Sequence, residues 1–387
     1  MPKDLIVFGE DWQRHPSSSQ HVVTQLAAYH RVLWVNSIGL RQPRLSLKDG
    51  KRIVEKLFSM VKARLFSQSN QPKSDLPQAL IVLSPIVFPA PQSSLLRALN
   101  RQLLKWQVNR VAKRMGLQSR ALWIALPTAV DIVGHLQEDN VIYYCGDDFS
   151  ALAGVDHQHV TACEKELAAK ANHILVASEK LSQKFSKLGY ASKTAMLPHG
   201  VDFDLFSKPA ALAANLCKEQ PVAGFYGSIA SWLDLDLIAK AARRLPNWRF
   251  VFIGNIQTDV SMLRSLPNIE FLPAVEHSVL PQYVQHWTIS MLPFRQCSQI
   301  RSCDPLKLRE YLAAGRPIVS TDFPALRPYT GLITVVDDVE DFVNALLKAD
   351  QSSQDLLHRR GAFQRLSVRS ESWKHRALQV HRLIDAY

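Results

Sequence analysis

The feature that most constrains the fold is a series of short apolar runs separated by helix-like segments, and this series occurs twice along the chain. The runs in the first half are LIVFG, RVLWVN, LIVLS, ALWIALP, VIYYCGDD, HILVAS and TAMLPHG. Those in the second half are AGFYGSI, WRFVFIG, IEFLP, WTISMLP, RPIVSTD and LITVVDD. Strands that are apolar on both faces and alternate with helices are typical of parallel sheets covered on both sides. We therefore predict an α/β protein with two doubly wound, Rossmann-like domains.

The length and the turn content predict where these domains meet. A chain of 387 residues exceeds the size at which one hydrophobic core keeps growing. The stretch 198–223 is rich in turn formers and contains no strand pattern. We expect an N-terminal domain at 1–205, a C-terminal domain at 206–368, and a helix at 369–387 that returns toward the first domain. Ligands of doubly wound folds bind at the carboxyl ends of the strands, so two facing domains would enclose an interdomain cleft.

Composition indicates a soluble intracellular protein. Hydrophobic residues make up 47% of the chain and charged residues 21%, which is ordinary for a globular protein. The N-terminus is unlike a signal peptide, and the longest apolar stretch, ALIVLSPIVFPAP, is short and broken by prolines. The five cysteines form no CxxC pair, which favours reduced thiols in the cytoplasm.

Positive charge is concentrated in one part of the first half. Residues 41–75 hold nine Lys/Arg against three acids, and residues 76–130 hold seven Lys/Arg and no acid, while the whole chain carries +12. Two helix-like segments in this region, 51–68 and 93–115, combine apolar and basic side chains. They predict contact with an anionic membrane surface, or simple packing on the sheet with solvated charges outside. No nucleic-acid-binding motif accompanies the charge. The apolar residues expected on one side of the second segment are Leu96, Leu99, Leu103, Val108 and Val111.

A short stretch in the second half, DPLKLREYLAAGRPIVSTD at 304–322, suggests a ligand site at the start of a helix. Asp304 is a good N-cap and Pro305 suits the first helical position, while Gly315 would end the helix. Lys307 then falls in the first turn, where free N–H groups and the helix dipole favour an anion such as phosphate. Glu310 is one turn further on the same face. The alternative is a solvent-exposed Lys–Glu pair.

A glycine after a strand adds to this site. Gly227-Ser228 ends the run AGFYGSI before a helix-like segment, and a glycine there lets the backbone approach a phosphate closely. A plain tight turn is the alternative. The chain lacks both GxGxxG and the phosphate-binding loop GxxxxGK[ST].

These motifs resemble those of the group 1, family 4-like glycosyltransferases of the GT-B fold. The stretch at 304–320 is similar to that family's PLKxxEYLAxGxPVV, and PHGVD at 198–202 to its domain-junction motif. The segments EDWQRHPSSSQHVVTQLA and YYCGDDFSALAG are similar to exopolysaccharide and teichuronic-acid members.

The resemblance implies that the domain at 1–205 is the acceptor-side domain and that the domain at 206–368 binds the nucleotide sugar. It also implies roles for particular residues in binding a nucleotide-diphosphate sugar. Lys307 would bind the diphosphate, Glu310 the ribose hydroxyls, and the Gly227-Ser228 backbone the pyrophosphate, with the base received near Pro273 and Val275. The helix start would line the same donor site through Asp304, Pro305 and Leu306. No metal or other cofactor is expected, because Lys307 and the helix N-terminus supply the positive charge that the leaving group requires.

On the acceptor side, acids follow two strands of the first half. Asp147 and Asp148 end the run VIYYCGDD, and one of them could face the cleft as a polar acceptor contact or a base. Capping or an Asx-turn is the competing interpretation. Asp11, after the first strand, could contact the acceptor or the donor sugar.

Together these features predict a glycosyltransferase, cytoplasmic and peripheral at the inner face of the cell membrane, that uses a lipid-linked or polysaccharide acceptor in cell-envelope or exopolysaccharide synthesis. The resemblance implies retention of anomeric configuration. Two departures from the family pattern keep alternatives open. Ser302 stands where the family carries an acid, and Trp232 and Asp234 follow the strand where it carries an Arg–Lys pair. The alternatives are a nucleotide-sugar epimerase on the same fold and a non-catalytic nucleotide-sugar-binding scaffold subunit.

Overall fold

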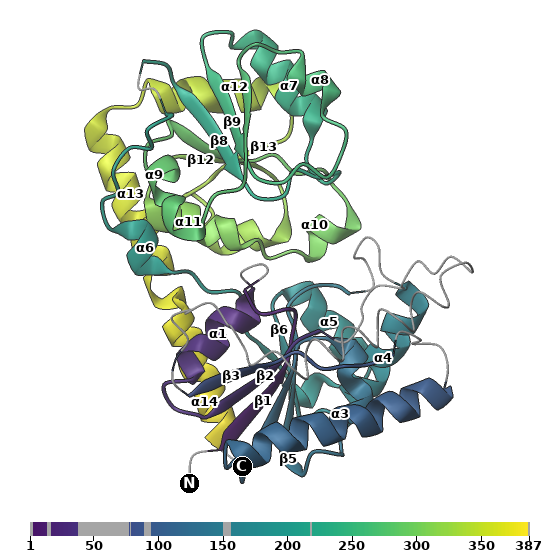
Figure 1. Cartoon of the computed structure of the whole chain (residues 1–387). Helices are drawn as coiled ribbons and strands as arrows, with labels where there is room; N and C mark the ends of the chain where they lie inside the picture. The colour runs from purple at the N-terminus through teal and green to yellow at the C-terminus, as the bar shows by residue number, and fades with distance from the viewer. Residues whose placement is uncertain are drawn as a thin grey trace. The chain divides into compact units, whose positions relative to one another are not determined.

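A computed structural model describes residues 3–13, 17–37, 77, 79–88, 94–149, 156–216 and 219–385. These residues form two sheets, one of seven strands and one of six, each flanked by helices (Figure 1). The predicted segment 51–68 lies outside the described residues. The fold class predicted from the sequence, two doubly wound α/β domains, is confirmed. The predicted boundaries after residues 205 and 368 stay predictions, as does the cleft.

The first sheet has the strand order β3-β2-β1-β4-β5-β6-β7. Its central pairs are parallel, with Leu5 of β1 in register with Val32 of β2 and Ala121 of β4. From β1 the chain adds β2 and β3 on one side of the sheet and then β4 to β7 on the other side. The order therefore reverses between β1 and β4. The strands are β1 (Asp4–Phe8), β2 (Val32–Val35), β3 (Leu80–Leu83), β4 (Arg120–Ile124), β5 (Glu138–Cys145), β6 (His173–Val176) and β7 (Thr194–Met196).

The second sheet repeats this topology with the order β10-β9-β8-β11-β12-β13. Here the order reverses between β8 and β11, which are paired in parallel. In open α/β sheets such a reversal leaves a crevice at the carboxyl ends of the two strands, where ligands bind. The strands are β8 (Val222–Tyr226), β9 (Arg249–Ile253), β10 (Ile269–Leu272), β11 (Ile289–Leu292), β12 (Ile318–Thr321) and β13 (Thr334–Val336).

Helices connect the strands in both halves. Those of the first half are α1 (Ser18–Leu26), α3 (Ser94–Arg114), α4 (His157–Lys170), α5 (Glu179–Lys187) and α6 (Phe203–Ser207). Those of the second half are α7 (Leu235–Arg244), α8 (Ser261–Arg264), α9 (Pro281–Val284), α10 (Ser298–Ser302), α11 (Leu306–Ala314), α12 (Val339–Asp350), α13 (Gln354–Val368) and α14 (Trp373–Asp385).

The core explains why the strands are apolar on both faces. Every residue of β1, β2 and β4 is buried, and so is every residue of β8 and β11. Large aromatic side chains fill the layers between sheet and helices, among them Trp34, Trp123 and Trp287. Burying such side chains is the main favourable contribution to folding, at about 25 cal/mol per Å² of apolar area.

Helix α3 buries the face predicted for it only in part, since Val108 is buried as predicted. The residues it buries are Leu104, Val108 and Ala112, which are spaced four apart and therefore lie on one stripe. Leu99, which we placed on the packed side, is 49% exposed, so that part of the prediction is wrong. The leucine pattern did not identify the buried face correctly, because leucines occur on more than one side of this helix.

Candidate active site

Helix α11 begins one residue later than predicted. It spans Leu306–Ala314, and the N-cap position is held by Pro305, whose apolar ring cannot accept a capping hydrogen bond. Asp304 as the N-cap is therefore wrong. Its carboxylate instead accepts a hydrogen bond from Arg309 at 2.6 Å, and the backbone N–H of His199 donates to it at 3.1 Å. The helix ends as predicted at Gly315, whose φ of 72° is the left-handed conformation that glycine adopts without strain.

Lys307 extends from this helix to the glycine turn that follows β8. Its Cε and Nζ lie 3.0 and 3.2 Å from the point that a Cβ atom on Gly227 would occupy. Its ammonium group also lies over two aromatic rings, 5.3 Å from the centroid of Phe225 and 5.8 Å from that of Phe294. Because β8 and β11 are the strands between which the order reverses, Lys307 and Gly227 meet at the switch point of the second sheet.

The ammonium group of Lys307 forms no ion pair with any of the described residues. Burial lowers its pKa, and the charge of Glu310 opposes this shift only in part. Burying a cation without an ion-pair partner is costly, so an anion bound beside it would stabilise the charged form. The neighbouring Cys303 is not a nucleophile, because burial raises the pKa of its thiol to about 12.

Glu310 is held by two side chains that the sequence did not indicate. His277 contacts its Oε1 at 2.6 Å, and the hydroxyl of Tyr226 donates to its Oε2. Burial and the nearby Glu310 raise the pKa of Tyr226 well above its ordinary value, so the phenol stays protonated and remains a donor. Both oxygens of the predicted ribose-binding carboxylate therefore have partners within the protein, and His277 and Tyr226 fix its orientation.

The His277–Glu310 pair predicts a pH-dependent contribution to stability. Burial alone would lower the pKa of His277, but the hydrogen bond and charge of Glu310 raise it above its ordinary value. Such a contribution is fully present below the unfolded-state pKa of about 6.5 and is lost as the pH rises through the folded-state pKa. We expect His277→Gln to lower the melting temperature more near pH 6 than near pH 9. His358→Gln, an exposed site on α13, is the control; equal losses at both pH values for His277→Gln would contradict the linkage.

A second glycine supports the turn beside Lys307. Gly254, after β9, has φ +144°, and a Cβ there would lie 2.1 Å from the carbonyl oxygen of Gly227. Real Cβ atoms do not approach backbone so closely, so Gly254 permits the turns after β8 and β9 to pack together. This requirement comes from a neighbouring strand and has no local signal in the sequence.

Gly254→Ala is therefore expected to displace the Gly227 turn. We expect a loss of about 1–3 kcal/mol in the free energy of unfolding, together with weaker stabilisation by nucleoside diphosphates in thermal shift. Gly331→Ala is a matched control, because Gly331 has φ +85° but no atom within 4 Å of its Cβ position. If both variants retain the nucleotide response of the wild type, Gly254 does not support the site.

Three other predicted donor residues follow the carboxyl ends of strands in the second sheet, while Pro305 and Leu306 lie at the start of α11. Ser228 is half-buried next to Gly227, and Pro273 and Val275 follow β10, the proline exposed and the valine half-buried. Because β10, β9 and β8 are adjacent in the sheet, their ends lie along one edge. The predicted pyrophosphate and base contacts are therefore carried by consecutive strands, and their roles stay predictions.

Beneath α11 lies a buried charge network centred on Arg309. Its guanidinium donates to Asp304 at 2.6 Å and to Glu371 at 2.6 Å. Arg376 and the hydroxyl of Tyr329 also donate to Glu371, each at 2.9 Å. Burial alone would lower the pKa of Arg309, but the adjacent carboxylates raise it, so this arginine stays charged. The network fixes the start of α11, which carries Lys307.

The two acids after β5 have different surroundings. Asp148 forms an ion pair with Lys184 at 3.1 Å, whereas Asp147 accepts a hydrogen bond from the N–H of Asp148 at 2.8 Å. Burial raises the pKa of Asp147, as expected of a carboxyl group suited to proton transfer. Neither residue caps α4, whose N-cap is Asp156. Of the two, Asp147 better fits the predicted role of base.

Asp11 follows β1, and its Oδ1 accepts a hydrogen bond at 2.8 Å from the hydroxyl of Ser37, the second residue after β2. Its neighbour Glu10 was not predicted as a site residue. The carboxylate of Glu10 accepts from Ser17 and from Gln20, and burial raises its pKa. Glu10 therefore adds a second half-buried carboxyl group at the carboxyl end of β1, where the order of the first sheet reverses.

The two sheets have the topology of the GT-B fold. Residues 220–351 match the model of the family described as glycosyl transferases group 1, and this span includes Gly227, Lys307 and Glu310. The predicted resemblance is thereby confirmed, and the chain is an enzyme of the glycosyltransferase class.

Individual relatives place the chain within this class. It is 29% identical over 273 residues, covering 65% of this chain and 68% of the relative, to TuaH of Bacillus subtilis (strain 168), whose name assigns it to teichuronic acid biosynthesis as a glycosyltransferase. Among solved structures, sucrose-phosphate synthase from Thermosynechococcus elongatus matches with a TM-score of 0.68 at 14% identity, covering 98% of each chain. HepE of Anabaena in complex with UDP matches with a TM-score of 0.68 at 11% identity, covering 99% of this chain and 100% of that one.

Proposed function

We propose that this glycosyltransferase transfers a sugar from a nucleoside-diphosphate donor to a lipid-linked or polysaccharide acceptor in cell-envelope or exopolysaccharide biosynthesis. The observation that carries the proposal is Lys307, a cation without a carboxylate partner among the described residues, beside the Gly227 turn at the switch point of the second sheet. The name of TuaH supports an envelope polysaccharide product, and the complexes of HepE with UDP and glucose support a sugar nucleotide donor.

The proposed chemistry requires stabilisation of charge on the departing diphosphate. Lys307 and the N–H groups around Gly227 and Ser228 would bind that charge without a metal ion, because donors aimed at developing negative charge lower the barrier. Glu310, oriented by His277, would accept from a ribose hydroxyl. Asp147 would serve the acceptor, and the reaction would retain anomeric configuration, as the resemblance implies.

The experiment that tests this proposal combines ligand binding with turnover. Thermal shift with UDP, GDP, ADP, CMP and dTDP identifies the donor base, since a ligand bound only by the native state raises its stability. The matching sugar nucleotide is then incubated with a bacterial lipid extract, and nucleoside diphosphate and glycolipid are quantified together. Equal amounts of both support transfer. A nucleotide response without turnover would indicate a scaffold, and an altered free sugar nucleotide an epimerase.

We further propose that α3 holds the enzyme on an anionic membrane. The helix has no acid and six basic residues, and its exposed stripe contains Leu95, Leu99 and Trp106, which are 82%, 49% and 59% exposed. The guanidinium of Arg110 lies 5.4 Å from the ring centroid of Trp106. Apolar side chains flanked by cations are what an interfacial helix requires. None of the helices in the described ranges has the length and hydropathy to cross a bilayer.

Replacing the exposed apolar stripe should release the protein from vesicles. We expect Leu95→Ser/Leu99→Ser/Trp106→Ser to reduce partitioning onto vesicles of phosphatidylglycerol and phosphatidylcholine by at least about tenfold, because each buried methylene contributes about 0.8 kcal/mol. Cosedimentation measures this effect. Phe363→Ser on α13, where the side chain is 66% exposed, is the control. Equal retention of the triple variant and the control would exclude α3 as the membrane contact.

A further inference from the structure

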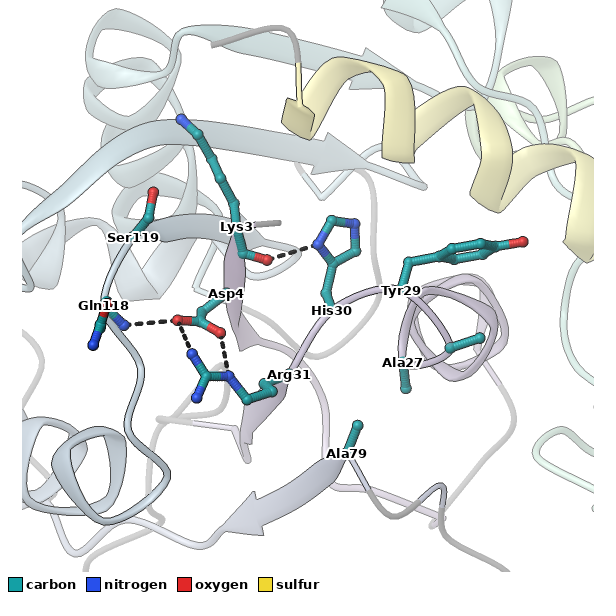
Figure 2. Close-up of a pocket in the computed structure, with 10 residues that line it drawn as sticks. Lys3, Asp4, Ala27, Tyr29, His30, Arg31, Ala79, Gln118 and Ser119 are labelled. Atoms are coloured by element: carbon teal, nitrogen blue, oxygen red, sulfur yellow. Dashed lines mark hydrogen bonds and ion pairs between the residues drawn. The ribbon is translucent and has the colours of Figure 1, made fainter. Parts of the chain in front are cut away.

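A histidine cluster lies at the amino ends of the first sheet, on the edge opposite to Asp11 and Glu10. His30 precedes β2, and Lys3 precedes β1. Both line a cavity of about 460 Å³ together with Asp4, Tyr29 and Arg31 (Figure 2). The proposed transfer reaction uses none of these residues.

His30 is fixed in one tautomer by the backbone. Its Nδ1 lies 2.6 Å from the carbonyl oxygen of Lys3, a contact that requires the proton on Nδ1 (Figure 2). The other ring nitrogen, Nε2, is then left with its lone pair. The residue is buried, with 3% of its surface exposed. A buried neutral imidazole with its N–H on a carbonyl oxygen is the usual arrangement of a metal-ligating histidine.

Two side chains from the last turns of α14 complete the cluster. The Nδ1 of His381 lies 2.9 Å from the Nε2 of His30, and the Nε2 of His381 lies 3.5 Å from a carboxylate oxygen of Asp385. The ring of His381 stacks on Tyr29 with centroids 4.7 Å apart, which limits its rotation. One ligand atom from each of His30, His381 and Asp385 lies within 4.8 Å of the other two.

We propose that His30, His381 and Asp385 form a binding site for a divalent transition metal of the Zn²⁺ type, with water at the fourth position. Two imidazoles and a carboxylate are a ligand set suited to this ion. Ligand atoms on tetrahedral Zn²⁺ are about 3.3 Å apart, so the two imidazole nitrogens would separate by about 0.4 Å. The contacts of His30 and Asp385 are to different ring nitrogens of His381, and the ligand atoms lie within 4.8 Å of one another, so the third ligand would move closer by up to about 1.5 Å. The neighbouring cations do not oppose the ion, because Arg31 is paired with Asp4 at 2.7 Å and Lys3 with Asp139 at 3.3 Å.

The bound ion would join the last turn of α14 to the segment between α1 and β2. These ligands are about 350 positions apart in sequence, so a metal that binds only the native arrangement stabilises it through binding. The site is therefore structural and independent of the transfer reaction at Lys307.

Calorimetric titration of Zn²⁺ into the full-length, chelator-treated protein tests the proposal. We expect one equivalent to bind to the wild type and the affinity to fall by more than about 100-fold in His381→Gln and in Asp385→Asn. His375→Gln, an exposed histidine on the same helix, should bind as the wild type does. With Co²⁺ in place of Zn²⁺, the intense visible absorption of a tetrahedral complex should appear in the wild type only.

Two outcomes would overturn the proposal. If His381→Gln and Asp385→Asn bind Zn²⁺ with the affinity of the wild type, the ion binds elsewhere. If the wild type binds no Zn²⁺, the cluster is a hydrogen-bonded histidine pair alone. Both substituted side chains are outside the sheet core, and the circular dichroism of each variant verifies that it is folded before titration.

Discussion

Lys307→Ala is expected to weaken nucleoside-diphosphate binding by about 1.5–3 kcal/mol, the range of a charge-assisted hydrogen bond. The ammonium group lies beside the Gly227 turn, with Phe225 and Phe294 beneath it, and burial lowers its pKa. A bound diphosphate would supply the missing counter-ion. Isothermal titration with the nucleotide identified by thermal shift measures the change in affinity directly.

The same substitution should leave the fold intact, and this separates binding from stability. Removing a largely desolvated charge that forms no ion pair among the described residues removes a desolvation cost, so the melting temperature without nucleotide should not fall. Lys240→Ala, an exposed lysine on α7, is the control and should change neither quantity. Unchanged nucleotide affinity in folded Lys307→Ala would exclude the diphosphate role and weaken the proposed function with it.

The rate of transfer gives a second readout. If Lys307 stabilises charge that develops on the leaving diphosphate, kcat should fall in addition to any rise in KM, because the interaction strengthens in the transition state. A rise in KM with kcat unchanged would mean that Lys307 binds the donor equally in the ground and transition states. The two outcomes are distinguished by measuring rates up to saturating donor concentration, where kcat alone sets the rate.

The parts of the fold that the sequence predicted are those specified by local pattern. Strands such as β1 and β8 are apolar on both faces over four to five residues, and that pattern does not depend on what packs against them. Lys307 and Gly227 were also found from local features, a helix start and a strand end. Their contact follows from topology, because both lie at the switch point of one sheet.

The parts that the sequence did not predict depend on distant partners. The residues that hold Glu310 are 33 and 84 positions away along the chain, and no local rule relates them. For Asp304 a local rule did exist, that of helix capping, but a contact with another side chain overrides it. An aspartate before a helix usually accepts a hydrogen bond from a backbone N–H of the first turn. Here the carboxylate of Asp304 accepts instead from the guanidinium of Arg309, which is the stronger, charged donor.

Ser302, the departure from the family pattern, illustrates what a motif comparison leaves open. Its hydroxyl donates to the carbonyl oxygen of Ser298 within α10, and the residue is 2% exposed. The hydroxyl of this buried serine is used within the helix. Ser302 therefore cannot make the contact to the sugar that a carboxylate makes at this position in the family. Lys307 and Glu310 remain at the positions that the motif requires, and the motif therefore supports the proposed donor binding more than the sugar contact.

Arg309→Met is expected to be the most destabilising of the substitutions considered, lowering the free energy of unfolding by about 3–5 kcal/mol. The guanidinium and Asp304 are 6% and 5% exposed, and Glu371 is 20% exposed. Methionine fills much of the volume but leaves Asp304 charged, buried and without its cation. Urea unfolding measures the loss, and hydrogen exchange of the α11 amides locates it. Arg359→Met is the control, since its pair with Asp355 is about 70% exposed and is worth less than about 1 kcal/mol.

A double variant tests whether the unpaired carboxylate is the cause. In Arg309→Met/Asp304→Asn the amide can still accept the N–H of His199, while the buried negative charge is gone. We expect this variant to regain at least about 1 kcal/mol relative to Arg309→Met, because removing both charges of a buried pair costs less than removing one. If the double variant is as unstable as the single one, the loss comes from packing around Arg309 and not from the charge of Asp304. Recovery of stability together with weak nucleotide binding would show that the network also positions Lys307.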